Sequence, residues 1–194
     1  MLDKKEDILN CGRELFSSKG FKDTNVADIT KMAGIGVGTF YNYYPSKEKL
    51  FLDIFLEENV KLKKKIMQSV NLEDEPLKVV REVLALNISG MDSNPILRQW
   101  YNKDVFGKIE RLYREENGIS VVDFVYDSFA ETIKKWQNEG KMRKDMDSEL
   151  IMAIFTAIIN IDTHKEEIGL QYFPHLLDYL AEFVMKGLTD CEKG

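Results

Sequence analysis

The stretch from Ala33 to Leu50, AGIGVGTFYNYYPSKEKL, decides the fold of this 194-residue chain. A glycine such as Gly34 tolerates the left-handed backbone that closes a helix, so a short helix is expected to end there. A second short helix is expected to begin near Gly36. Two helices joined by a turn of about three or four residues that contains glycine are typical of the helix-turn-helix, whose second helix enters the DNA major groove.

Helical spacing separates an inner and an outer face in this stretch. Phe40 and Tyr44 lie four residues apart and are expected to point inward, while Thr39, Asn42 and Tyr43 fall elsewhere on the helix surface. Upstream, Thr24 or Asn25 can accept a hydrogen bond from the free N–H groups that open the first helix of the pair. For Tyr41, a core position stays an alternative to an exposed one.

Short motifs extend this pattern on both sides: Gly20-Phe21, Thr24-Asn25-Val26-Ala27-Asp28-Ile29, Ala33-Gly34-Ile35, Gly38-Thr39-Phe40-Tyr41 and Ser46-Lys47-Glu48-Lys49-Leu50. Together they resemble the N-terminal signature of the TetR/AcrR-type bacterial transcriptional regulators. The resemblance covers about the first quarter of the chain. It implies an all-α fold of about nine helices, with a helix-turn-helix DNA-binding domain over residues 1–48 and a helical ligand-sensing and dimerisation domain over residues 49–194.

Three positions depart from the family pattern. Gly36 stands where a capping serine is usual, Ala27 where a polar residue is frequent, and Thr30 where alanine is usual. Loss of the side-chain cap at Gly36 costs the short helix roughly a few tenths of a kcal/mol. The departure at Ala27 removes a contact to DNA from the first helix of the pair, so sequence discrimination is expected to depend on the second.

Composition agrees with a globular protein that binds DNA through one surface. Residues 1–50 contain eight Lys and Arg against seven Asp and Glu, although the whole chain has a net charge of −6. An incidental asymmetry remains the alternative explanation. The two cysteines and two histidines have no metal-ligand spacing, so no metal or cofactor is expected. The charged N-terminus and the absence of a long apolar run predict a soluble, cytoplasmic protein.

Glycine, proline and capping residues predict the remaining helices. They are expected over about residues 4–19, 46–70, 76–89, 95–117 with a break near Tyr101 or Asn102, 119–139, 147–164 and 171–188. The lysines at 61 and 63–65 are interpreted as a solvated face of the second of these helices.

The last two helices predict self-association. The run from Leu150 to Ile161 is apolar around almost its whole circumference, so both of its sides require cover. A two-fold dimer through a four-helix bundle is what the family resemblance implies, and two central helices of one core are the alternative. The expected interface residues are Ile151, Ile154, Phe155, Ile158, Leu176, Leu180, Phe183 and Val184.

A dimer would read a palindromic operator in double-stranded DNA, with two recognition helices about one helical turn apart. The expected DNA-binding residues are Asn25, Val37, Gly38, Thr39, Tyr41, Asn42, Tyr43 and Lys47. Val37, Gly38 and Thr39 are expected at base edges, and Tyr41, Tyr43 and Lys47 at phosphates.

The family resemblance further implies an unknown small-molecule effector that binds the body and releases DNA. The aromatic residues in the middle of the chain are the candidate ligand-binding positions: Trp100, Tyr101, Phe106, Tyr113, Tyr126 and Phe129. Each of them also fits ordinary core packing.

Two other classes of function fit the sequence less well. An enzyme is not expected, because the chain has no Gly-rich phosphate loop and no strand–turn–serine elbow. A nucleoid or adaptor protein that uses the helix-turn-helix without a small-molecule ligand remains the alternative to a ligand-responsive repressor. Equal affinity for random and cognate DNA would favour the nucleoid protein.

Overall fold

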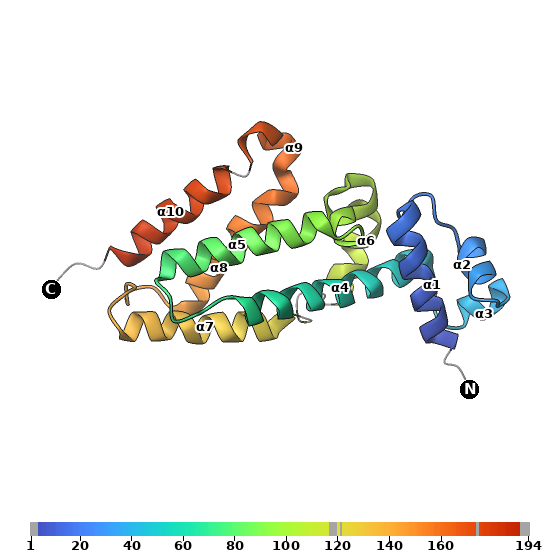
Figure 1. Cartoon of the computed structure of the whole chain (residues 1–194), viewed down its shortest axis with the longest axis horizontal. Coiled ribbons are helices and arrows are strands. Elements are labelled where there is room, and N and C mark those ends of the chain that lie inside the picture. The colour runs from blue at the N-terminus through green and yellow to red at the C-terminus, as the bar shows by residue number, and fades with distance from the viewer. Residues whose placement is uncertain (1–3, 117–119, 121, 174, 191–194) are drawn as a thin grey trace. The chain divides into compact units, whose positions relative to one another are not determined.

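All regular structure in the described part of the chain is helical, as expected. The computed structural model describes residues 4–116, 120, 122–173 and 175–190, with the side chains of residues 162 and 163 excepted. Its α-helices are α1 (Lys4–Lys19), α2 (Val26–Met32), α3 (Val37–Tyr41), α4 (Lys47–Ser69), α5 (Pro76–Ser93), α6 (Lys103–Glu115), α7 (Asp123–Asn138), α8 (Ser148–Asn160), α9 (Lys165–Ile168) and α10 (His175–Thr189) (Figure 1). None of these helices combines the length and apolar character needed to cross a bilayer.

The chain divides into two compact units. One unit contains Met1–Leu62 and Gly90–Val121, and the other contains Lys63–Ser89 and Val122–Gly194. Two of the three boundaries fall inside long helices, between Leu62 and Lys63 in α4 and between Ser89 and Gly90 in α5. The functional boundary expected after residue 48 is a different division, and it stays a prediction.

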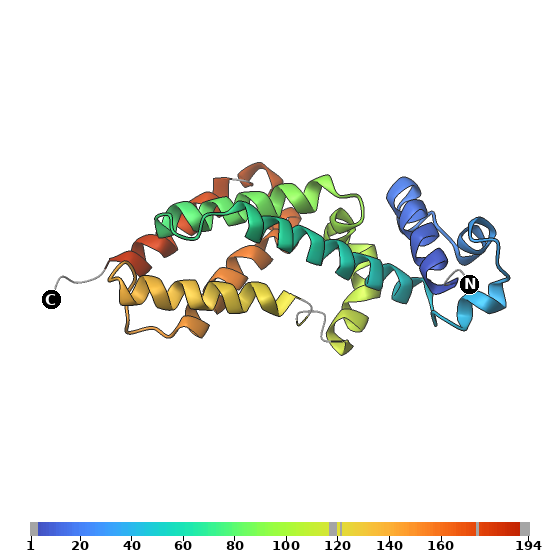
Figure 2. The ribbon, with the colours of Figure 1, turned by 60° about the horizontal axis from the view of Figure 1, so that its bottom comes forward.

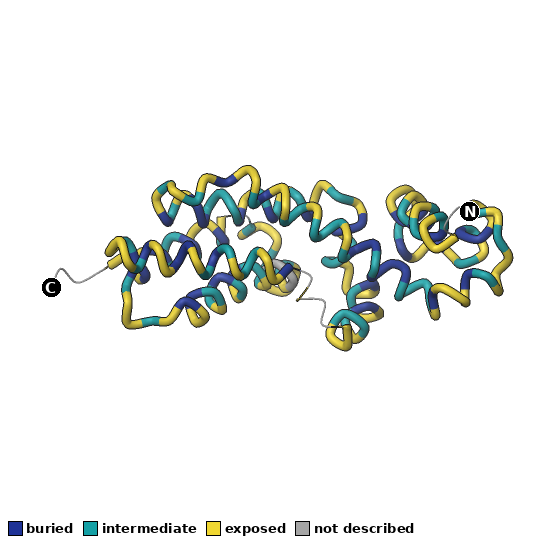
Figure 3. The backbone as a smooth tube through the Cα atoms, turned by 90° about the horizontal axis from the view of Figure 1, so that it is seen from below, coloured by how far each residue is buried: buried dark blue, intermediate teal, exposed yellow. Residues whose placement is uncertain are grey.

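The first unit has an aromatic core. Phe16, Phe21 and Phe51 meet with ring centroids 5.0–5.9 Å apart, which joins α1, the turn after it and the first turns of α4. Phe40 and Tyr44 belong to the same buried cluster. Along the longer helices, buried positions alternate with exposed ones, so each of these helices buries one face (Figure 3).

In the second unit, α8 packs against α7 and α10 (Figure 2). Asp147 caps α8 through a 2.7 Å hydrogen bond from Leu150 N to its Oδ1. Arg81 on α5 donates hydrogen bonds to Asp178 and Glu182 of α10 at 2.7 and 3.0 Å, which ties these two helices together.

Most helix boundaries agree with expectation, and the break predicted near Tyr101 or Asn102 is confirmed. A 3-10 helix, η1, covers Leu97–Tyr101, and Asn102 then caps α6 by accepting a hydrogen bond from Asp104 N at 3.1 Å. Cys11 is a free thiol, whereas Cys191 lies outside the described residues.

Two expectations about helices were wrong. The last helix begins at His175 instead of residue 171, and Phe173 before it is extended, because the residue before a proline is biased away from helical conformation. Lys63 is not part of a solvated face. Its ammonium donates a hydrogen bond to the buried amide of Asn87 on α5, a contact that helical spacing within α4 could not reveal.

The turn between α2 and α3 gives the first prediction. Gly34 has φ +65°, and nothing lies within 4 Å of a Cβ built on it, so Gly34→Ala should cost about 1 kcal/mol through backbone strain alone. Gly38 lies inside α3 with equally open surroundings. Gly38→Ala should therefore stabilise the protein by roughly 0.5–1 kcal/mol. Urea unfolding measures the free energy of unfolding of both variants. The prediction is contradicted if both substitutions stabilise the protein or both destabilise it.

Candidate nucleic-acid interface

The helix-turn-helix is closed by hydrogen bonds at both ends of α2. Asn25 is the residue that caps α2, because its Oδ1 accepts a hydrogen bond from Asp28 N at 2.8 Å. The Thr24 hydroxyl instead donates to Gly20 O at 2.8 Å. At the other end, Ile35 N donates to Thr30 O and Gly34 N to Lys31 O, which is the bond pattern of a Schellman motif. The direction of the chain entering α3 is therefore set by α2.

Helix α3 is short, and its inward side chains hold it in place. Phe40 and Tyr44 are fully buried, as predicted. Gly36 precedes α3 without a side-chain cap, so the departure noted in the sequence is real. A helix of five residues has little stability in isolation, so the burial of these two rings keeps α3 in position.

The opposite face of α3 is open to solvent. Val37, Tyr41 and Tyr43 retain 46%, 53% and 41% of their accessible surface. Gly38 and Asn42 are also exposed, and Thr39 is half-buried. The alternative of a core position for Tyr41 is wrong, because Phe40 and Tyr44 occupy the inner face. Apolar, hydroxyl and amide groups are thus presented together on one exposed short helix.

Lys47 has a role that the sequence did not indicate. Its ammonium donates hydrogen bonds to Phe21 O at 2.8 Å and to Thr24 O at 2.7 Å, and it lies 4.2 Å from the centroid of the Phe21 ring. Burial lowers the pKa of Lys47, while the nearby Glu48 carboxylate opposes that shift. The lysine joins the first turn of α4 to the turn between α1 and α2, and one of its three N–H groups remains for a phosphate.

Lys31 is a cation that the sequence reasoning missed. It is exposed in the last turn of α2, beside the turn into α3, and no carboxylate among the described residues pairs with it. Lys22, by contrast, pairs with Asp104, and Lys19 lies 3.6 Å from a carboxylate oxygen of Asp28. Among these three lysines, Lys31 is the one whose charge is not already compensated.

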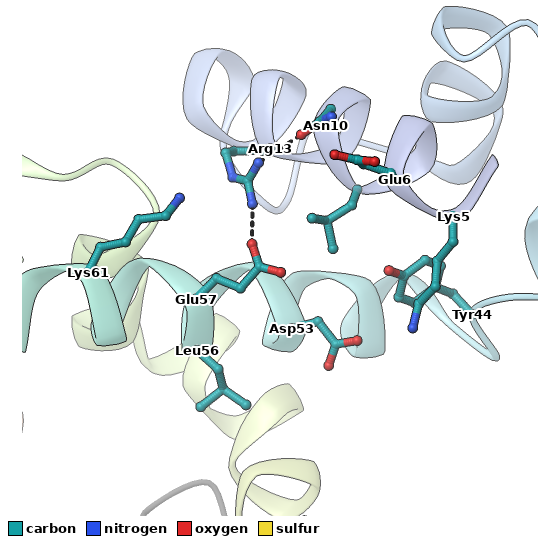
Figure 4. Close-up of a pocket in the computed structure, with 10 residues that line it drawn as sticks. Lys5, Glu6, Asn10, Arg13, Tyr44, Asp53, Leu56, Glu57 and Lys61 are labelled. Atoms are coloured by element: carbon teal, nitrogen blue, oxygen red, sulfur yellow. Dashed lines mark hydrogen bonds and ion pairs between the residues drawn. The ribbon is translucent and has the colours of Figure 1, made fainter. Parts of the chain in front are cut away.

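A groove of about 600 Å³ lies between α1 and α4 (Figure 4). Arg13 crosses it to pair with Glu57, and Asn10 accepts a further hydrogen bond from Arg13 at 2.9 Å. Its lining mixes acidic and basic side chains, and it includes none of the aromatic residues predicted to bind a ligand.

Those predicted ligand-binding residues fall into both units. In the first unit, Trp100 stacks on Phe55 with ring centroids 4.9 Å apart and meets Phe106 and Tyr113 edge-on at 4.7 and 5.0 Å. These rings pack against one another, which is the arrangement expected in a protein core. Tyr101 is half-buried beside this cluster.

The other two predicted ligand-binding residues, Tyr126 and Phe129, lie on α7 in the second unit, where Phe129 is buried.

The predicted dimer residues divide by burial. Ile151, Phe155 and Ile158 are buried within the single chain, so they pack in its own core and have little surface left for a partner. Ile154, Leu176, Leu180 and Val184 are half-buried, and Phe183 keeps 62% of its surface.

On α10, Tyr179 stacks on Phe183 with ring centroids 6.0 Å apart and is also exposed. Helix α10 therefore has an apolar face that its own chain leaves uncovered.

A short solvent-exposed helix, held by a preceding helix and a tight turn in an otherwise all-helical chain, defines a helix-turn-helix DNA-binding protein. Residues 8–54 match the family described as bacterial regulatory proteins, tetR family. Over these residues the chain therefore carries a TetR-family regulatory domain.

Relatives agree with this assignment. The chain is 33% identical over 86 residues to the HTH-type transcriptional regulator YuxN of Bacillus subtilis, a match that spans 44% of this chain and 30% of YuxN. Over 193 residues it is 21% identical to YdgC of the same organism, which covers 97% of this chain and 85% of YdgC.

A solved structure shows the same fold along the chain. The FadR protein of Thermus thermophilus, a TetR-family transcriptional repressor in complex with lauroyl-CoA, superposes with a TM-score of 0.64. The two sequences are 23% identical, and the match covers 94% of this chain and 91% of FadR.

The position of Lys47 gives the second prediction. Lys47→Met keeps most of the aliphatic stem but removes two charge-assisted hydrogen bonds, so the free energy of unfolding should fall by about 1–2 kcal/mol. The exposed Lys64 on α4 provides a control, and Lys64→Met should stay within about 0.5 kcal/mol of wild type. Urea unfolding at neutral pH measures both, and equal stabilities would show that the ammonium does not brace the turn.

Proposed function

We propose that this regulator binds a palindromic operator in double-stranded DNA as a homodimer, represses transcription in the cytoplasm, and is released by a small-molecule effector. The exposed face of α3 carries the DNA-binding part of the proposal. Val37, Gly38 and Thr39 face base edges, where Val37 offers only apolar contact, such as to a thymine methyl group. A small and mostly apolar set of reading residues leaves much of the affinity to phosphate contacts.

The phosphate contacts come from exposed hydroxyls and cations around α3. Tyr41 and Tyr43 present their phenols beside the reading face, and Lys31 presents an uncompensated ammonium before it. Lys47 contributes its remaining N–H group, and Asn25 and Asn42 contribute exposed amides. These contacts set the register and affinity of the protein on DNA without reading its sequence.

Dimerisation is supported by the uncovered apolar face of α10. Two copies of this face, with the exposed parts of α8, would bury Phe183 and Tyr179 and complete a four-helix bundle. A dimer is needed for the operator proposed here, because one short helix contacts only a few base pairs.

An effector is supported by the relatives. FadR of Thermus thermophilus was solved with an acyl-CoA and is described as a repressor. The same all-helical body is present in this chain, so a ligand that binds the second unit is the proposed release signal.

Randomised-site selection tests the reading face. Thr39→Ala should change the selected base preference, since its hydroxyl is proposed to meet a base edge. Gly38→Ala should weaken operator binding even though it stabilises the helix, because a methyl group there blocks close approach of the backbone to DNA. An unchanged base preference for Thr39→Ala would contradict the placement of α3 in the major groove.

Phosphate contacts predict a different response. Lys31→Ala and Tyr43→Phe should each lower affinity roughly three- to tenfold for all sequences alike, and Lys31→Ala should also reduce the salt dependence of binding. Lys64→Ala on α4 is the matched control for the lost charge. Fluorescence anisotropy with the chain's own upstream DNA and with random DNA, at several salt concentrations, measures these effects. A base-specific effect of either variant would refute the assignment.

Sedimentation velocity tests the dimer. Phe183→Glu places a charge on the uncovered face of α10 and should yield monomers at micromolar concentration with weakened operator binding. Phe124→Glu, at an exposed phenylalanine near the start of α7, is the control and should leave the dimer intact. A wild-type monomer, or a dimer that survives Phe183→Glu, would contradict this interface.

A further inference from the structure

Lys63 and Asn87 form an unusual polar pair inside the second unit. Lys63 lies on α4 and Asn87 on α5, and the lysine ammonium donates a hydrogen bond to Asn87 Oδ1. Asn87 keeps only 6% of its accessible surface. Lys63 itself is half-buried, and none of the described carboxylates lies within ion-pair distance of it.

The pair has unused hydrogen-bond donors. A lysine ammonium can only donate, so the oxygen of Asn87 must face it and the Asn87 NH₂ group must point elsewhere. That NH₂ group, and the other N–H groups of Lys63, have no acceptor among the described residues. The two side chains thus offer several donors and no free acceptor oxygen.

Buried apolar side chains neighbour the pair along both helices. Ile66 and Leu84 lie three residues from Lys63 and Asn87 along their respective helices, on neighbouring positions of the same faces, and both are buried. Burial lowers the pKa of Lys63 to about 8, and no charged group of the described residues compensates for it. A charge kept in such a place costs folding free energy, and perturbed groups of this kind gather at functional sites.

We propose that Lys63 and Asn87 bind the carboxylate of a small organic acid whose apolar part lies among the buried side chains of the second unit. One carboxylate brings one negative charge, which balances the single ammonium, whereas a phosphate dianion would leave an uncompensated charge. Its oxygens accept hydrogen bonds from Lys63 and Asn87 together. This inference rests on the proposed function, because it identifies the chemical class of the effector.

Matched acids and alcohols provide the test. Calorimetric titration of the full-length protein with octanoate and benzoate, against 1-octanol and benzyl alcohol, should show at least tenfold tighter binding of one acid than of its alcohol. Lys63→Met should remove this preference, while Lys64→Met on the exposed side of α4 should retain it. Asn87→Asp should also remove it, since the new carboxylate would occupy the lysine in place of the ligand.

Acid binding should depend on pH in a direction set by Lys63. The free ammonium loses its proton with a pKa of about 8, so the affinity for the acid should be constant between about pH 6 and 7.5 and fall above pH 8, approaching tenfold per pH unit. In Lys63→Met this fall should disappear. Retention of the fall in the variant would assign the titration to another group and overturn the proposal.

Two further outcomes would also overturn it. If neither acid bound more tightly than its alcohol, the unused donors would be satisfied by water alone. If the Lys63→Met or Asn87→Asp variant kept the preference for the acid, and circular dichroism showed that it was folded, another site would hold the carboxylate. Operator binding of the wild-type protein, measured without added acid, separates this inference from the proposed function. If the protein does not bind the operator, the proposed function is contradicted. If it binds the operator but shows no preference for an acid over its alcohol, only the carboxylate site is contradicted.

Discussion

The DNA-binding part of this protein depends on the burial of Phe40 and Tyr44. Helix α3 has five residues and no side-chain cap, so local hydrogen bonding cannot keep it folded. Two aromatic rings on its inner face hold it against a core built on Phe16, Phe21 and Phe51. Because that core orients the helix, Val37 and Tyr41 stay exposed to solvent.

A second constraint is the ammonium of Lys47. It binds two carbonyl groups of the turn between α1 and α2, and so connects the start of α4 to the helices before the recognition helix. A residue in a DNA-binding signature is readily interpreted as a DNA contact. Here most of its hydrogen-bonding capacity is used inside the protein, and Lys31 has the charge that remains available for a phosphate.

The second unit contains two kinds of polar contact. Most of its ion pairs, such as that between Arg81 and Asp178, lie at the surface and contribute little to stability. Lys63 and Asn87 are the contrast, because a half-buried ammonium next to a neutral amide has a lowered pKa, and the proposed carboxylate would offset the cost of its charge. The apolar face of α10 likewise stays exposed among the described residues, and the proposed second copy would cover it.

The sequence by itself determined the all-helical class, the helix-turn-helix between residues 25 and 44, the inward positions of Phe40 and Tyr44, and the break before α6. These features depend on periodicity, glycine and capping residues, which act over a few residues. The start of α10 was missed, although Pro174 in the sequence indicates it. Only the tertiary structure decided that Lys47 braces a turn, that Lys63 donates a hydrogen bond to Asn87, and that Ile151 belongs to the core while Phe183 does not. Each of these outcomes depends on contacts between residues far apart in the chain, and no local pattern encodes such contacts.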